Sequence, residues 1–468
     1  VGSEMCIRDR YKHFIDDCLA GKEHTLSEKE EALLAKASQM STVPNEVFSK
    51  FNNADVKFGK VKRENGQEDE LTNGNFATFM ESHDRTVRKA AFEALYKQYG
   101  AYINTIAAAF YGNVKQAMFY ADARGYKSTL NMYLDGSFIP ENVYKNLIKT
   151  VNDNLDKMYC YVDIRKKTLG VDKLHFYDIY APMVEDIDWK ISYDEAKDIV
   201  VKALAPMGEE YVSHIKEGFN NGWVDVYENT GKRSGAFSWG AYGTHPYVFL
   251  NYSDTLNDVF TVIHEMGHAM HTYYSNANQP YIYAGYKIFV AEVASTCNEA
   301  ILMQYMLKNT DDKKKKRYLL NHFFEQFKGT LYRQTMFAEF EMEAHAKAEH
   351  GEVLSAESLC AMYKKLNEKY FGPDMVIDDE IALEWARIPH FYTPFYVYQY
   401  ATGYSAAIAI STKILAGDEQ VIAGYRKFLS GGSSMHPIEL LKLCGIDMTR
   451  PDVVQEALDV FGELLKQW

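Results

Sequence analysis

The sequence is poor in cysteine, and its cysteines are scattered. The 6 cysteines among 468 residues show no C-x-x-C spacing; they are Cys6, Cys18, Cys160, Cys297, Cys360 and Cys444. Such scatter argues against a disulfide framework and fits thiols that stay reduced. The sequence therefore predicts a cytoplasmic protein.

Long apolar runs and an excess of positive charge are also missing. No apolar run approaches the length of about 18 residues that a membrane-spanning helix needs, and the first residues lack the apolar segment of a signal peptide. Lys and Arg number 51 against 64 Asp and Glu, which gives a net charge of −13. This balance argues against nucleic acid or an anionic membrane surface as a partner.

Internal repeats and low-complexity tracts are absent as well, and helical patterns fill most of the chain. The exceptions are a hairpin pattern between residues 55 and 75 and three short strand-like segments, Trp223–Tyr227, Ala236–Trp239 and Tyr247–Leu250. The predicted fold is therefore mainly α, with a small β-sheet just before the segment 261–271.

A metal-binding motif occurs at residues 264–268, which read His-Glu-Met-Gly-His. Residues four apart on a helix share a face, about 6 Å apart along the axis, so His264 and His268 can hold one ion. Zn²⁺ suits imidazole nitrogen, and Glu265 can reach a water on the metal without being a ligand itself. Two core histidines on an amphipathic helix are the alternative.

A catalytic zinc site needs a third protein ligand. His271 lies one turn beyond the motif, and three ligands stacked along one helix cannot easily surround an ion. The extended motif with glycine at 271 and histidine at 274 is excluded, because the chain has His271 and Tyr274. The next helical segment carries two acids in an apolar run, and an acid there needs a partner. We assign Glu292 as the third ligand and Glu299 as a carboxylate that orients a ligand histidine; a solvated helix end is the alternative for Glu299.

These motifs together resemble the M3 family of zinc oligopeptidases, and within it the oligoendopeptidase F branch. The resemblance runs from about Phe58 to the C-terminus. It rests on His264–His268, on Glu292 followed by Val-Ala-Ser, and on the supporting segments Gly235–Ser238, Asn278–Tyr281 and Ile388–Tyr392.

The resemblance implies a zincin-like, thermolysin-type fold whose helical body encloses the site in a channel and excludes folded proteins. It also implies a smaller N-terminal helical domain, residues 1–62, and a catalytic region, residues 63–468. Members of the family carry more chain before this point, and the sequence begins without an initiator methionine. We therefore expect a truncated N-terminal domain, with residues 1–10 a foreign translated segment.

An edge strand beside the zinc helix would bind the substrate main chain, as a thermolysin-like peptidase requires. We expect this strand to consist of Gly235, Ala236, Phe237 and Ser238; an interior sheet strand is the alternative.

A second cluster, residues 390–404, is rich in tyrosine. In the family, a histidine and tyrosines from this part of the chain line the cleft and hydrogen-bond the transition state. The resemblance therefore implies His390 and Tyr398 as donors to the oxyanion, with Tyr392 and Tyr396 lining the substrate site. An aromatic core is the alternative.

The sequence thus predicts a zinc metalloendopeptidase that acts on short peptides with one Zn²⁺ ion. His264, His268 and Glu292 hold the ion, and Glu265 takes a proton from the zinc-bound water that attacks an internal peptide bond. A zinc carboxypeptidase of related fold and a catalytically dead peptide-binding fragment are alternatives. A structural zinc site is a third, but it would leave Glu265 without a role.

Overall fold

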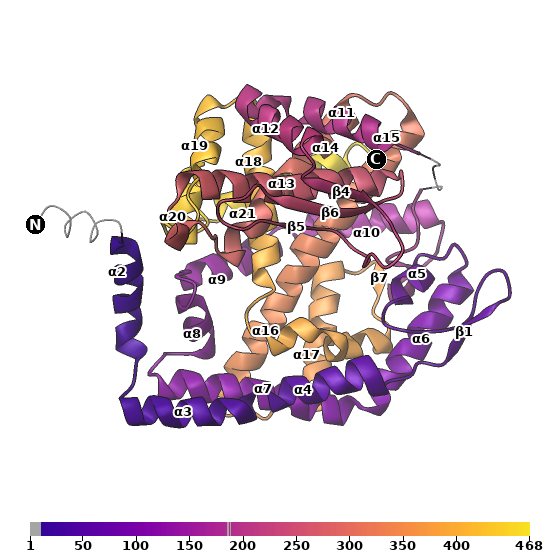
Figure 1. Ribbon diagram of the computed structural model, residues 1–468. Helices are drawn as coiled ribbons and strands as arrows, with labels where there is room; N and C mark the ends of the chain where they lie inside the picture. Colours follow the sequence, from indigo (N-terminus) through magenta and orange to yellow (C-terminus); the bar gives the residue numbers. More distant parts are fainter. Residues whose placement is uncertain (1–10, 185–186, 188) are drawn as a thin grey trace, which may run out of the picture. The chain divides into compact units, whose positions relative to one another are not determined.

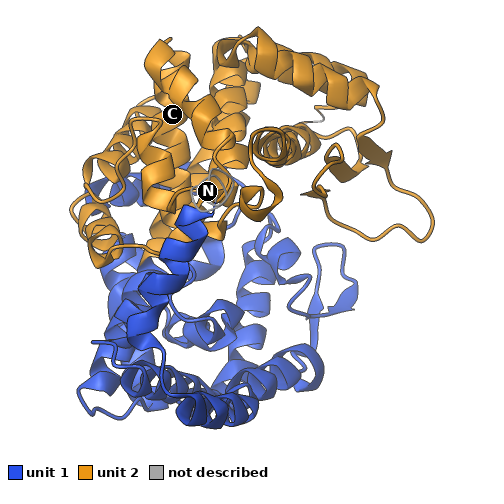
Figure 2. Ribbon diagram, turned by 60° about the vertical axis from the view of Figure 1, so that its left-hand side comes forward, with its two compact units in different colours: residues 1–136, 155–183, 336–397 blue, residues 137–154, 184–335, 398–468 orange. Residues whose placement is uncertain are grey.

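The structure is a computed structural model that describes residues 11–184, 187 and 189–468. The expectation that residues 1–10 are foreign concerns a segment outside this described part. The chain divides into two compact units, coloured blue and orange in Figure 2. Unit 1 comprises residues 1–136, 155–183 and 336–397, and unit 2 comprises residues 137–154, 184–335 and 398–468. The expected domain boundary at residue 62 falls inside unit 1.

Unit 1 is helical, with two small two-stranded sheets (Figure 1). The antiparallel hairpin of β1 (Lys60–Lys62) and β2 (Glu68–Glu70) confirms the hairpin predicted between residues 55 and 75, and β3 (Leu174–His175) pairs in parallel with β7 (Met375–Val376). The helices are α2 (Lys12–Ala20), η1 (Gly21–His24), α3 (Glu28–Ser41), α4 (Val43–Lys50), η2 (Phe51–Asp55), α5 (Phe76–Met80), α6 (Arg85–Ala101), α7 (Ile103–Ala123), α8 (Thr129–Asp135), α10 (Leu155–Leu169), η3 (Phe176–Asp178), α16 (Arg333–Glu349), whose first turn belongs to unit 2, α17 (Ala356–Phe371), η7 (Asp379–Arg387) and η8 (Pro389–Tyr392).

A buried ion cluster lies inside unit 1. The Asp178 carboxylate is fully buried and accepts from the guanidinium groups of Arg85, at 2.7 Å, and Arg88, at 2.8 Å. The backbone carbonyl of Asp178 accepts from Arg165 at 3.0 Å. A buried charge needs such partners, so this cluster links α6 and α10 to the turn at η3.

Unit 2 contains the zinc-motif segment and a three-stranded sheet. Strand β6 (Tyr247–Tyr252) is central; it pairs in parallel with β4 (Val224–Tyr227) and antiparallel with β5 (Phe237–Trp239). The helices are α9 (Glu141–Asn152), α11 (Tyr193–Ala203), η4 (Ala205–Met207), α12 (Glu209–Asn220), α13 (Leu256–Asn278), η5 (Tyr281–Tyr283), α14 (Ile288–Lys308), α15 (Lys313–Gln326), η6 (Phe327–Tyr332), α18 (Tyr398–Leu415), α19 (Glu419–Leu429), α20 (Pro437–Lys442) and α21 (Asp452–Leu465).

The core of unit 2 is built around α14, which packs against α13 and α18 (Figure 1). Its sequence is apolar on all sides, as a helix surrounded by other helices requires, and Val290, Val293 and Ala294 are completely buried. Glu292 and Glu299 are therefore acids set into a core helix. The prediction of a mainly α fold with a small sheet is confirmed.

In the described part of the chain, no helix is both long enough and apolar enough to cross a membrane.

Candidate metal centre and active site

Helix α13 carries the His-Glu-Met-Gly-His motif and begins with a capping box. The Thr255 hydroxyl accepts from the backbone N–H of Asp258 at 3.2 Å, and the Asp258 carboxylate accepts from the N–H of Thr255 at 2.9 Å. This pairing satisfies two N–H groups that the first helical turn leaves without partners. The motif lies two turns further along, where the helix is fully formed.

Gly267 lets α13 and α14 approach closely. A Cβ atom at this position would lie 2.7 Å from the Cα atom of Ser295 and 2.8 Å from the carbonyl oxygen of Ala294. Asn298 of α14 adds a link by donating to the carbonyl of Ile263 at 3.3 Å. The close contact brings the acids of α14 to the histidines of α13.

Three side chains converge where the helices meet. The Glu292 Oε2 atom lies 3.5 Å from Nε2 of His264 and 3.3 Å from Nε2 of His268. These ligand atoms all lie within 4.8 Å of one another. Two atoms bound to one ion at about 2.1 Å in a tetrahedral arrangement are about 3.4 Å apart. The spacing therefore fits a single tetrahedral zinc ion, which three protein ligands would leave with one open position.

The orientation of His264 is set by Glu299. The Nδ1 atom of His264 is hydrogen-bonded to Oε1 of Glu299. An ionised carboxylate can only accept, so Nδ1 carries a proton, and Nε2 is the ring nitrogen that faces Glu292 and that a metal ion would bind once Nε2 has lost its proton. The role predicted for Glu299, orienting a ligand histidine, stays a prediction that this contact supports. Ser295 supports Glu292 in a similar way, because its hydroxyl donates to Oε2 of Glu292 at 2.8 Å.

The charges of the cluster stabilise one another. Burial lowers the pKa of His264, but the hydrogen bond to Glu299 and the nearby carboxylates outweigh burial and raise this pKa to about 9. Burial raises the pKa of Glu292, but the hydrogen bond and charge of His268 prevail and lower it to about 2. A bound cation would take the place of the imidazole proton.

Glu265 follows the first histidine and is 7% exposed. Burial raises the pKa of its carboxyl group, against the opposing effect of His264 and His268. A carboxylate whose pKa is raised holds a proton more readily than an ordinary one, which suits a group that accepts and returns a proton.

Strand β5 runs along α13 beside the two histidines. Gly235 and Ala236, which precede the strand, share a pocket of about 220 Å³ with Thr261 of α13. At the other end, a Cβ atom on Gly240 would lie 2.7 Å from Cγ2 of Thr272. His264 and His268 lie between these two points of α13. Strand β5 ends the order β4–β6–β5, so within the described residues it is an edge strand, as predicted, although it begins at Phe237 rather than at Gly235.

The tyrosine-rich segment is divided between the two units. His390 is exposed in unit 1, with its ring 6.1 Å from that of Tyr396, and Tyr392 is buried there against Phe48. Tyr398 opens α18 in unit 2, where it is buried and its ring lies 6.1 Å from that of Phe289, one turn before Glu292. The burial of Tyr392 and Tyr398 agrees with the alternative of an aromatic core. The transition-state roles of these residues stay predictions.

Reasoning from the sequence missed one member of the site and undervalued another. Ser295 was noted only within a matching segment, although its position three residues after Glu292 places both on one helix face. Gln326 was not found at all. It donates to Glu299 at 3.0 Å from 27 residues further along the chain, and no local spacing signals such a contact.

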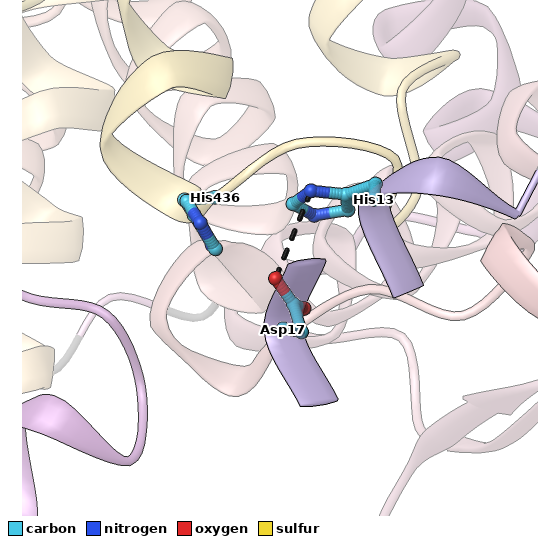
Figure 3. Close-up of side chains that lie close together, drawn as sticks. All are labelled: His13, Asp17 and His436. Carbon is cyan, nitrogen blue, oxygen red and sulfur yellow. Dashed lines mark ion pairs between the residues drawn. The ribbon is translucent and has the colours of Figure 1, made fainter. Parts of the chain in front are cut away.

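Helix α2 carries another pair of potential ligands. His13 Nδ1 lies 3.7 Å from Asp17 Oδ1 (Figure 3). His436, which the figure also shows, belongs to unit 2. Two side chains on one exposed helix do not provide the three protein ligands of a catalytic zinc site, and we assign no metal to this pair.

Two family models together match most of the chain. The model of Peptidase family M3 matches residues 78–460, and the model named Oligopeptidase F matches residues 9–58. The gap between the two matches, residues 59–77, contains the β1–β2 hairpin, and both sides of it lie in unit 1.

Individual relatives match almost the whole chain. Oligopeptidase PepF of Bacillus subtilis is 52% identical, over 98% of this chain and 68% of its own length. Group B oligopeptidase PepB of Streptococcus agalactiae is 44% identical, over 99% of this chain and 77% of its own. The crystal structure of oligoendopeptidase-F from Enterococcus faecium is 36% identical, with a TM-score of 0.84, and covers 99% of this chain and 78% of that chain.

Proposed function

The chain belongs to peptidase family M3 and is a metallopeptidase that acts on oligopeptides, and we propose that it cleaves internal bonds of short peptides with one zinc ion. The observation that carries this proposal is the convergence of His264, His268 and Glu292, at separations that suit one tetrahedral ion. His264 Nε2, His268 Nε2 and a Glu292 oxygen would hold the ion. When bound, the ion would lower the pKa of a water molecule and polarise the scissile carbonyl.

Glu265 is the general base and then the general acid. Its carboxylate takes one proton from the attacking water, whose oxygen forms the new bond to the carbonyl carbon. As the C–N bond breaks, Glu265 returns that proton to the leaving nitrogen, so the base is regenerated. Tyr398, which lies in unit 2 with the three ligands, is the proposed donor to the oxyanion that develops between these two steps.

The substrate lies along β5. An extended peptide pairs with a strand edge through its main chain, and this gives affinity without a fixed sequence. The strand also has an aromatic outer face: Phe237 is opposite Phe249, and Trp239 is opposite Tyr247. Phe237, Trp239 and Tyr247 are 42%, 73% and 51% exposed. Exposed aromatic side chains grouped in this way suit contact with apolar side chains of a peptide.

The remaining composition fits this proposal. The five described cysteines are free thiols, as in a cytosolic protein, and the net charge of −13 disfavours nucleic acid and anionic membranes as partners. Short peptides in the cytosol are therefore the proposed substrates.

The test uses a quenched fluorogenic peptide blocked at both ends. The wild-type protein should cleave it, lose this activity with a chelator and regain it with zinc. Glu265→Gln should bind zinc as the wild type does and lose cleavage by a factor of at least about 100, because the base is gone. Cleavage of peptides with free C-termini only would indicate a carboxypeptidase, and zinc binding without any cleavage would indicate a peptide-binding protein.

A further inference from the structure

The hydrogen-bond chain that starts at His264 does not end at Glu299. Oε1 of Glu299 accepts from His264, and Oε2 accepts from Nε2 of Gln326 at 3.0 Å. A carboxylate has no proton to give, so the Gln326 amide nitrogen must face it. Each oxygen of Glu299 therefore has its own donor, and the carboxylate plane is fixed at both ends.

Gln326 is the group that holds the second oxygen. His322 of α15 and Tyr404 of α18 also interact electrostatically with Glu299. However, the His322 Nε2 atom and the Tyr404 hydroxyl are buried without a hydrogen-bond partner in the described chain. The Glu299 side chain is only 18% exposed, so an oxygen without a donor there would be costly.

The position of Gln326 is fixed by the helix that carries it. Gln326 is the last residue of α15, and the π-helical segment η6 follows directly. The next side chain, Phe327, is completely buried, with its ring 4.9 Å from that of Phe461 and 5.1 Å from that of Tyr404. Single π turns inside longer helices are frequent at functional sites. Here the turn begins at the residue after the amide that contacts Glu299.

We propose that Gln326 is a positioning residue of the metal centre, acting through Glu299 on His264. A neutral donor is suited to this task. It holds the carboxylate in place without cancelling its charge, so Glu299 keeps its full attraction for the His264 N–H. The imidazole ring then keeps the orientation in which Nε2 could bind an ion. A lysine at 326 would neutralise Glu299, and an acid would repel it.

This inference rests on the proposed function, because it requires a metal on His264. Loss of a hydrogen-bond partner behind a metal ligand typically costs about 10- to 100-fold in metal affinity. Gln326 is one step further out, so Gln326→Leu should weaken zinc binding by about 3- to 10-fold.

The experiment measures the zinc dissociation constant of the metal-stripped full chain by competition with a chromophoric chelator, without any turnover. The variants are Gln326→Leu, Gln326→Glu, Glu299→Gln and the double variant Gln326→Leu/Glu299→Gln. Gln304→Leu is the matched control, because Gln304 is a half-buried glutamine on α14. Thermal unfolding of each stripped variant reports on folding.

Weaker zinc binding by Gln326→Leu and Gln326→Glu, but not by Gln304→Leu, is the expected result. In the Glu299→Gln background, Gln326→Leu should have no further effect, because a residue that acts through Glu299 has nothing left to act on. An unchanged dissociation constant in folded Gln326 variants would overturn the proposal, and so would a loss of equal size in both backgrounds. A wild-type chain that binds no zinc would overturn this inference together with the proposed function.

Discussion

Gly267 shows at the scale of one residue how the motif depends on a second helix. The motif needs helix α14 within reach, and the residue between Met266 and His268 has no side chain to hold α14 away. Any Cβ at this position would meet the backbone of Ser295 and Ala294 at less than 3 Å. The glycine therefore contributes to the metal centre through packing, although it binds nothing.

Gly267→Ala should move α14 away from α13, weaken zinc binding and destabilise the fold by about 1–3 kcal/mol, because overpacking costs that much. Gly403→Ala is the control. It lies in α18 with no atom within 4 Å of the added Cβ, and replacing a helical glycine by alanine should stabilise by up to about 1 kcal/mol. Urea unfolding and zinc titration measure both effects. Equal behaviour of the two variants would contradict the account.

Glu341 is a buried acid that the proposed chemistry does not use. It is fully buried in unit 1; Oε1 accepts from the backbone N–H of Phe395, while Oε2 has no partner in the described chain. Burial raises the pKa of Glu341 to about 8, although the Phe395 N–H acts in the opposite direction. At a pH between the ordinary pKa of a glutamate and this raised value, Glu341 therefore stays protonated in the folded protein, whereas the same side chain is ionised in the unfolded chain.

This difference predicts a pH dependence. The stabilisation from the protonated Glu341 is complete below the unfolded pKa of about 4.5 and is lost as the pH rises to about 8. Glu341→Gln keeps an acceptor for Phe395 and removes the titration. Between pH 5 and 8, the free energy of unfolding should therefore fall less in Glu341→Gln than in the wild type. The two decreases should differ by an amount on the order of 3 kcal/mol. Parallel curves for the two proteins would show that Glu341 is ionised in the folded state.

At the scale of elements, β5 and α13 form the unit that the proposed chemistry uses. The helix supplies the two histidines, and the strand runs beside them from the pocket at Thr261 to the contact at Thr272. In the sheet that contains β5, inward residues such as Val248 of β6 are buried, whereas the outer aromatic residues Phe237 and Trp239 of β5 are exposed. The alternation of one buried and one open face follows from the two-residue period of a strand.

Trp239→Ala should raise KM for peptides with apolar side chains by about 3- to 10-fold, because an aromatic contact contributes about 0.5–1.5 kcal/mol. The value of kcat should stay unchanged, since Trp239 touches no reacting atom in this account. Phe119→Ala is the control: Phe119 is 51% exposed on α7 in unit 1. If both variants left KM unchanged, the outer face of β5 would not be a substrate contact.

At the scale of the whole molecule, stability depends on more than the metal centre. Asp178 lies in unit 1 and the ligand triad in unit 2. Asp178→Ala leaves Arg88 buried without its charge partner and should cost about 3–5 kcal/mol. Asp163→Ala, which removes an exposed pair with Lys167, should cost less than about 1 kcal/mol.

Both variants should keep the rise in unfolding temperature that zinc gives the wild type, because a ligand stabilises the folded state according to its own affinity. Differential scanning calorimetry with and without chelator measures this. Loss of the zinc-dependent rise in Asp178→Ala would show that the ion cluster of unit 1 supports the metal centre.

The parts that could be predicted from the sequence are those with a local or familiar signal. His264 and His268 share a helix face by spacing alone, and Glu292 is conspicuous as an acid in an apolar run. Gln326 and Glu341 had no such signal, because their partners lie far away in the sequence. The assembly of each unit from three separate stretches of the chain could not be predicted either. Helical periodicity shows which face of a helix is buried, but not which other helix buries it.

The central claim is that two imidazoles of α13 and the Glu292 carboxylate of α14 share one zinc ion. The most direct measurement is the X-ray absorption spectrum at the zinc edge of the full chain loaded with one equivalent of zinc. The expected spectrum shows two imidazole nitrogens and oxygen in the remaining positions, at about 2.0–2.2 Å, with a changed oxygen shell in Glu292→Ala. A sulfur ligand at about 2.3 Å, or a spectrum that Glu292→Ala leaves unchanged, would contradict it.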